Sequence, residues 1–213
     1  MSWAIAPTER RLNWVLEKLQ GEAAFKFAPR QIVQRENALL KAAAAVFTGG
    51  QSLYRAKRDR NANVHCLPSS VDAAHFERAA TLTDHPAQAA LARPRLGYYG
   101  VIDERIDYAL IDALAGTHPD WEIVMVGPVV KVDPATLPKH PNLHWLGQRP
   151  YAELPAFLAG WDVALLPFAL NDATRYISPT KTLEYMAAGR PIVGTPIADV
   201  AGPYGHIVRI AAD

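Results

Sequence analysis

The sequence predicts an α/β fold built on a doubly wound parallel sheet, preceded by a short and mostly helical N-terminal segment. Half of the 213 residues are apolar, which is enough for a sheet buried on both faces. From Arg95 onward, short continuous apolar runs alternate with segments of helical periodicity. Glycine and proline punctuate these runs, as expected where strands give way to turns. Together the observations indicate successive βα units.

The sheet domain is expected to span residues 95–213. Its helices are expected at residues 107–115 and 151–159 and from Ser178 to Gly189. In the last of these, Ser178 is the predicted N-cap, Pro179 the first helical residue and Gly189 the C-terminal stop. Its strands are the apolar runs at residues 96–99, 121–126, 142–146, 163–168, 192–194 and 207–210.

The chain before this domain reads differently. Leu12, Val15, Leu16 and Leu19 repeat at helical spacing, and a second helix should run from about Pro29 to residue 45. Short strands are expected at residues 46–48 and 63–67. We therefore expect residues 1–78 to form a separate N-terminal piece. Residues 79–94, rich in alanine, proline and threonine, are expected to be a linker.

Bulk properties exclude several classes of protein. The net charge of +1 argues against nucleic acid as a main partner, and the single cysteine, Cys66, excludes an intrachain disulfide framework. The seven histidines show no H-x-x-x-H or H-E-x-x-H grouping, so no metal site is predicted. No run of 18 apolar residues and no signal-peptide pattern occurs, so we expect a cytoplasmic protein.

Candidate binding residues follow the predicted strands, because doubly wound sheets bind ligands beyond the carboxyl ends of their strands. Lys181 lies in the first turn of a predicted helix, where a cation opposes the helix dipole by about 0.3–1 kcal/mol. With the Thr180 hydroxyl and free backbone N–H groups, it can form a phosphate cradle. Glu184, one turn further, can accept hydrogen bonds from sugar hydroxyls. The alternative is a surface Lys181–Glu184 pair worth about 0.2–0.5 kcal/mol.

The stretch SPTKTLEYMAAGRPIVGTP, residues 178–196, resembles the donor-binding signature of GT-B fold glycosyltransferases, in particular the retaining family 4 or group 1 transferases. By this resemblance the domain is Rossmann-like, the C-terminal half of a GT-B fold. Glu184 would hold the nucleotide ribose, while Ser178, Pro179, Thr180 and Lys181 would face the diphosphate. One departure is Tyr176, which stands where many members carry the acid that contacts the donor sugar.

The resemblance extends to the turns after the other strands. Gly100 matches a family glycine, and Arg105 best matches a cation that reaches the diphosphate, although it can instead pair with Asp103 or Glu104. Gly127 would let the nucleotide approach the backbone closely. Gln148 and Arg149 resemble the turn that frames the base, with a plain surface loop as the alternative.

The resemblance implies an enzyme of polysaccharide biosynthesis. It would transfer a sugar from a nucleoside diphosphate sugar to a sugar or lipid-linked sugar acceptor, with retention at the anomeric carbon and without metal or cofactor. Lipid-linked acceptors make peripheral contact with the inner face of the membrane compatible with this interpretation. No catalytic residue is assigned.

The first 45 residues are too few for a complete acceptor domain at roughly 30 residues per βαβ unit. We therefore expect the donor-binding half of a transferase with a remnant of the acceptor-side domain and without the closing C-terminal helices, weakly active or inactive alone. The alternatives are a non-catalytic nucleotide-binding or assembly module and a sugar-nucleotide epimerase of the same architecture.

Overall fold

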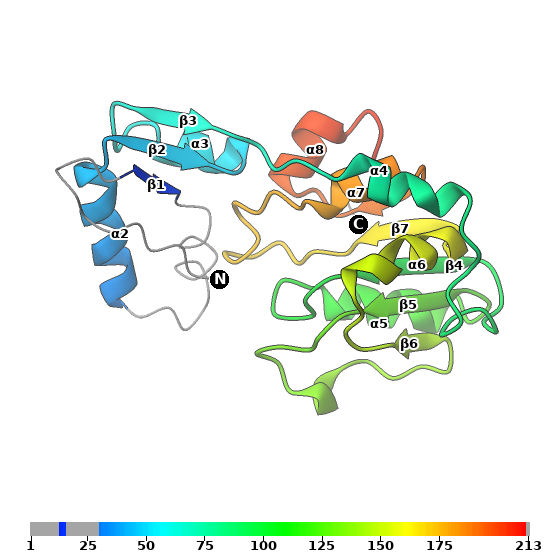
Figure 1. Ribbon diagram of the computed structural model, residues 1–213. Helices are drawn as coiled ribbons and strands as arrows, with labels where there is room; N and C mark the ends of the chain where they lie inside the picture. Colours follow the sequence, from blue (N-terminus) through cyan, green and yellow to red (C-terminus); the bar gives the residue numbers. More distant parts are fainter. Residues whose placement is uncertain (1–12, 16–29, 212–213) are drawn as a thin grey trace.

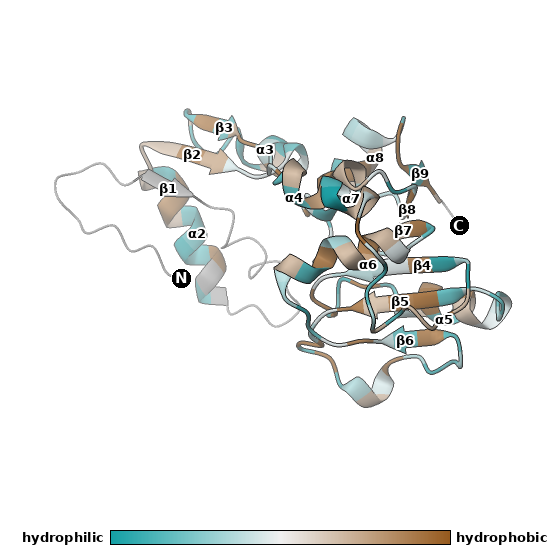
Figure 2. Cartoon of the chain, turned by 45° about the vertical axis from the view of Figure 1, so that its right-hand side comes forward, coloured by the Kyte–Doolittle hydropathy of each residue, from teal (hydrophilic) through white to brown (hydrophobic). Residues whose placement is uncertain are grey.

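The computed structural model describes residues 13–15 and 30–211, and their strands form two parallel sheets (Figure 1). The smaller sheet has the order β1-β2-β3 and the larger the order β6-β5-β4-β7-β8-β9. Apolar residues concentrate on the strands of the larger sheet. Helix α2 (Arg30–Ala42) mixes polar and apolar residues and belongs to the smaller unit, which comprises the described residues up to Cys66 (Figure 2). No described helix is both long and apolar enough to cross a membrane.

The smaller sheet is held together by helices that precede and follow its central strand. Leu40 and Val46 are fully buried between helix and sheet. The Lys57 ammonium donates to Glu36 at 2.6 Å and ties the two helices together. The elements are β1 (Asn13–Val15), α2 (Arg30–Ala42), β2 (Ala45–Thr48), α3 (Gln51–Lys57) and β3 (Val64–Cys66).

The N-terminal prediction is partly wrong. The second predicted helix corresponds to α2, but Asn13–Val15, predicted as helix, is strand β1 and pairs in parallel with Ala45–Phe47 of β2. Three residues fit either period, and pairing with a neighbouring strand decides between them. The described part of this segment therefore has three short strands instead of the two predicted, beside the helices α2 and α3. The remaining residues of the predicted first helix lie outside the described part of the chain.

The larger sheet confirms the predicted doubly wound fold. The chain starts at the centre in β4 and moves outward through β5 and β6. It then crosses to β7 and continues outward through β8 and β9 on the other side. Right-handed crossovers place helix α5 on one face and helices α7 and α8 on the other (Figure 1). The elements are β4 (Arg95–Tyr99), α5 (Tyr108–Thr117), β5 (Glu122–Val126), η2 (Pro134–Thr136), β6 (Leu143–Trp145), η3 (Tyr151–Glu153), α6 (Leu154–Gly160), β7 (Val163–Leu166), α7 (Lys181–Ala187), β8 (Ile192–Gly194), α8 (Ala198–Tyr204) and β9 (Arg209–Ile210).

The connection between the two sheets packs against the larger one. Helix α4 (Ala73–Glu77) and the turn η1 (Arg78–Ala80) carry Phe76 into the core of the larger sheet. Further on, Gln88 is 1% exposed and accepts a hydrogen bond from Trp161 at 2.9 Å. Residues 79–94 are thus a packed connection rather than a free linker. We propose that the division between the units lies at residues 67–71, before Phe76.

Gly97 in the central strand β4 has a packing reason. A Cβ atom built there would lie 1.9 Å from Cε2 of Trp161, a side chain that is fully buried. The bare strand therefore leaves room for the indole ring, and the ring in turn reaches Gln88 of the connection.

We expect Gly97→Ala to lower the free energy of unfolding by about 1–3 kcal/mol or more, because the added methyl group forces the Trp161 ring or the strand to shift. Urea unfolding of the two proteins measures the difference. Gly202→Ala is the matched control, because a Cβ at Gly202 meets nothing within 4 Å. Equal losses in both variants would contradict the packing argument.

Candidate functional site

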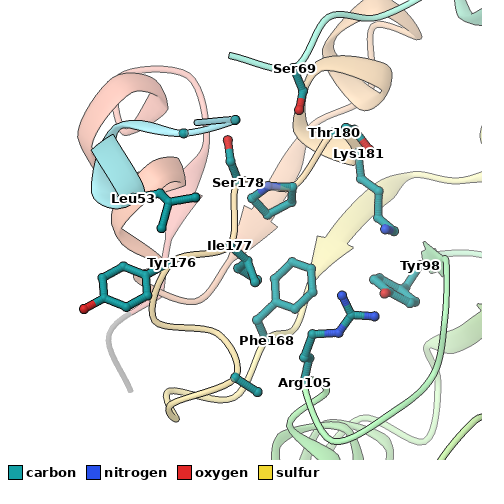
Figure 3. Close-up of a pocket in the computed structure, with 14 residues that line it drawn as sticks. Leu53, Ser69, Tyr98, Arg105, Phe168, Tyr176, Ile177, Ser178, Thr180 and Lys181 are labelled. Atoms are coloured by element: carbon teal, nitrogen blue, oxygen red, sulfur yellow. The ribbon is translucent and has the colours of Figure 1, made fainter. Parts of the chain in front are cut away.

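A pocket of about 280 Å³ opens at the carboxyl ends of β4 and β7. The strand order reverses between these two strands, and the crevice at such a reversal is where doubly wound sheets bind ligands. The smaller unit closes one side through the turn after β2 (Figure 3). The lining residues are Gly49, Gly50, Leu53, Ser69, Tyr98, Arg105, Phe168, Ala173 and 176–181.

Helix α7 starts at the pocket, later than predicted. Thr180 is its N-cap, has helical backbone angles and makes no side-chain cap hydrogen bond. The first turn closes through the Thr182 N–H, which donates to the Pro179 carbonyl at 3.1 Å. Ser178 is therefore not the cap. It packs against the smaller unit, where a Cβ built on Gly50 would lie 2.8 Å from the Ser178 Cβ.

Lys181 lies across the end of β4. Its Nζ is 5.6 Å from the centroid of the Tyr98 ring, and a Cβ at Gly100 would meet that Nζ at 2.7 Å. Gly100 also has a φ of +139°, so the position suits glycine for two reasons. Burial lowers the pKa of the Lys181 ammonium below its ordinary value of 10.5, while Glu184 opposes that shift and Arg105 adds to it. A buried cation of this kind has much to gain from an anion.

Glu184 lies one turn behind Lys181 and is held by Tyr99, which Tyr185 contacts in turn. The Tyr99 hydroxyl donates to its carboxylate at 2.7 Å, and the fully buried Tyr185 hydroxyl accepts from the Tyr99 N–H at 3.2 Å. Burial raises the pKa of Tyr99, and the neighbouring Tyr185 and Glu184 raise it further. The phenol therefore stays protonated and orients the carboxylate. Glu184 does not itself border the pocket among the described lining residues.

Arg105 makes the ion pair with Asp103 that was one of its two predicted roles. Its Nε donates to Asp103 Oδ1 at 2.9 Å and its Nη2 donates to Asp103 Oδ2 at 2.8 Å, and Asp103 is 3% exposed. The guanidinium also lines the pocket, at the same end as the Lys181 ammonium (Figure 3). The ion pair fixes the orientation of the guanidinium at the pocket wall, since bidentate pairing defines its plane.

The other predicted binding residues lie outside this pocket. Gly127 packs on the neighbouring turn, where a Cβ would come within 1.8 Å of the Gly100 carbonyl oxygen. Backbone packing therefore requires glycine at position 127, whether or not a nucleotide binds there. Gln148 and Arg149 follow β6, and Gln148 is exposed. Arg149 Nε is buried without a hydrogen-bond partner among the described residues.

A contact that sequence reasoning missed joins the two units. Asp199 in α8 is 5% exposed and accepts hydrogen bonds from Ser52, from the N–H at 2.8 Å and from the hydroxyl at 3.0 Å. Its carboxylate therefore caps helix α3 from the other unit, since the N-cap residue Gly50 has no side chain to do so. No local pattern could signal this contact, because the partners are 147 residues apart.

The sequence profile of the family described as "Glycosyl transferases group 1" matches residues 93–209, more than half of the chain. The chain belongs to the group 1 glycosyltransferases. Its match covers the larger sheet, including the turn at Gly100 and the whole of α7.

Three known proteins are similar to this chain in sequence or in fold. The putative teichuronic acid biosynthesis glycosyltransferase TuaH of Bacillus subtilis (strain 168) is 26% identical over 196 residues, 91% of this chain and 48% of TuaH. The UDP-forming α,α-trehalose-phosphate synthase of Burkholderia vietnamiensis gives a TM-score of 0.61 at 15% identity, over 82% of this chain and 50% of that one. The sucrose-phosphate synthase of Thermosynechococcus elongatus gives 0.60 at 17%, over 87% and 50%. These structures confirm the GT-B type of fold, and the chain spans about half the length of the relatives that it matches.

In the absence of ligand, we expect Lys181→Met to raise the free energy of unfolding by roughly 0.5–2 kcal/mol, because the substitution removes a desolvated cation. In the unsubstituted chain, the charged Lys181 ammonium lowers the free energy of unfolding by its full amount at pH values below its lowered pKa. This loss of stability disappears as the pH rises towards 10.5. Urea unfolding as a function of pH checks both statements. A gain from the substitution that does not shrink at high pH would contradict them.

Asp199→Ala should lower the free energy of unfolding by about 0.5–2 kcal/mol, since α3 loses its cap. Asp120→Ala, at an exposed position, is the matched control and should change little. The measurement is again urea unfolding, with hydrogen exchange at the amides of α3 as the local readout. Unchanged exchange at Ser52 would show that the carboxylate does not hold this helix.

Proposed function

We propose that this chain contributes the donor-binding half of a glycosyltransferase. The enzyme would move a sugar from a nucleoside diphosphate sugar to a hydroxyl of a sugar or lipid-linked sugar acceptor, with retention at the anomeric carbon. The observation that carries the proposal is the pair of cations, Lys181 and Arg105, facing one pocket at the strand-order reversal of the larger sheet.

The diphosphate is the part of the donor that this pocket suits best. Lys181 is a desolvated ammonium and Arg105 a guanidinium of fixed orientation, and both border the pocket. When the sugar–oxygen bond breaks, negative charge develops on the β-phosphate, and fixed cations in a partly buried site stabilise it. Because two side chains supply this charge, we propose that the transfer proceeds without a metal ion or other cofactor.

The nucleoside would extend towards Glu184. Its carboxylate is one helical turn from Lys181 and is oriented by the Tyr99 hydroxyl at 2.7 Å. Carboxylates held in this way accept hydrogen bonds from ribose hydroxyls in other nucleotide-binding sheets. Gly127, Gln148 and Arg149 remain proposed contacts for the nucleoside, beyond the pocket. Since the Burkholderia synthase is named UDP-forming, UDP is the first nucleotide to test.

We place the smaller unit on the acceptor side. Its Gly49 and Leu53 border the same pocket across from α7, so an acceptor bound there would face the donor. Transfer is expected to be weak or absent when this chain acts by itself, because it spans about half the length of the relatives that it matches.

Calorimetry with UDP, GDP and ADP tests the donor site. Lys181→Ala should weaken binding of the best nucleotide by about 1–3 kcal/mol, as expected for a lost charged hydrogen bond. Glu184→Ala should weaken binding of the nucleotide but leave binding of inorganic pyrophosphate unchanged. Lys139→Ala, at an exposed lysine, is the matched control.

The outcomes separate the competing functions. Donor hydrolysis or transfer supports the transferase, tight nucleotide binding without turnover supports a non-catalytic module, and interconversion of donor sugars supports an epimerase. If both Lys181→Ala and Glu184→Ala bind every nucleotide as the unsubstituted chain does, the site assignment is wrong.

A further inference from the structure

The pocket is chemically asymmetric. Lys181, Arg105 and Tyr98 lie together at one end, and Leu53 and Tyr176 lie at the other, with Phe168 and Ile177 between them (Figure 3). Leu53 is 5% exposed and Phe168 is 4% exposed. The cationic end suits phosphate, and the apolar end must suit a different part of the same ligand.

The apolar end offers few partners for sugar hydroxyls. Of the described residues that border the pocket, none is acidic and none carries a side-chain amide. The hydroxyls of Ser178 and Tyr176 are the polar side-chain groups nearest to this end (Figure 3). A hydroxyl buried against Leu53 and Ile177 would lose water without gaining a full set of hydrogen bonds. A methyl group placed there would instead gain by leaving water.

Chain direction indicates which part of the donor reaches the apolar end. Residues 176–178 precede α7 and border the pocket, whereas Glu184 lies one turn beyond Lys181 and is not among the lining residues. A nucleoside directed to Glu184 and a diphosphate at Lys181 therefore leave the sugar facing Ile177 and Tyr176. Leu53 joins them from the smaller unit, next in sequence to Ser52, which Asp199 holds.

We propose that the donor sugar carries a methyl-terminated substituent, seated against Leu53, Ile177 and Tyr176. The methyl group of a 6-deoxy sugar and that of an acetamido sugar both meet this description. The proposal rests on the proposed function, because it takes the nucleoside diphosphate at the cationic end as given. It makes Ile177 a residue that determines donor specificity.

Calorimetry with three donors of one nucleotide tests the proposal. UDP-glucose, UDP-N-acetylglucosamine and UDP-6-deoxyglucose are compared, or their GDP or ADP counterparts if that nucleotide binds more tightly. At least one methyl-bearing donor should bind about 10-fold or more tightly than the glucose donor, the usual scale for one apolar group in a fitted pocket. The donor that gains identifies the source of the methyl group.

Ile177→Thr keeps the branch at Cβ, removes the terminal methyl group and replaces a methylene by a hydroxyl. It should reduce the preference to less than about 3-fold while leaving affinity for the free nucleotide unchanged. Val130→Thr, at a valine that is 39% exposed, is the matched control and should keep the preference. Equal binding of all three donors, or tighter binding of the glucose donor, overturns the specificity proposal while Lys181-dependent nucleotide binding leaves the donor site standing. If no nucleotide binds, both proposals fail.

Discussion

Two close approaches, at the carboxyl ends of β5 and β4 and the start of α7, constrain the mouth of the larger sheet. Gly127 has no side chain because the Gly100 carbonyl lies where its Cβ would be, and Gly100 has none because the Lys181 side chain lies over it. The two turns therefore stack, and the ammonium is held above them beside Tyr98. A larger residue at either glycine would disturb the turns that hold the cation, so backbone packing and the proposed phosphate contact depend on the same positions.

The cation is retained at a cost in stability. Burial lowers the pKa of Lys181, and its neighbours compensate only in part, since Glu184 is already bound by Tyr99, Asp103 is paired with Arg105, and the Arg105 charge adds to the shift. Such uncompensated charge is common where a site must receive an oppositely charged ligand. The same logic extends to the smaller unit. Asp199 is buried, and its two hydrogen bonds to Ser52 keep Gly50 and Leu53 against the pocket.

The sequence predicts the larger sheet well because its signals are local. Apolar runs such as Ile123–Val126 are buried on both faces, and Ser178–Lys181 border a pocket beyond the carboxyl ends of the strands, where binding residues were predicted. The features that the sequence does not predict depend on contacts between residues that are far apart along the chain. Ser178 contacts Gly50 instead of capping a helix. The Tyr99–Glu184 hydrogen bond joins residues 85 apart, and the strand at Asn13–Val15 exists because β2 lies beside it.

The most direct test of the account is a crystal structure of the chain with bound UDP or the nucleotide that binds best. We expect phosphate oxygens within hydrogen-bonding distance of Lys181 Nζ and beside Arg105, with the ribose hydroxyls at Glu184. A nucleotide bound at another surface, or a phosphate group in the pocket with the Lys181 ammonium directed away from it, would contradict the account.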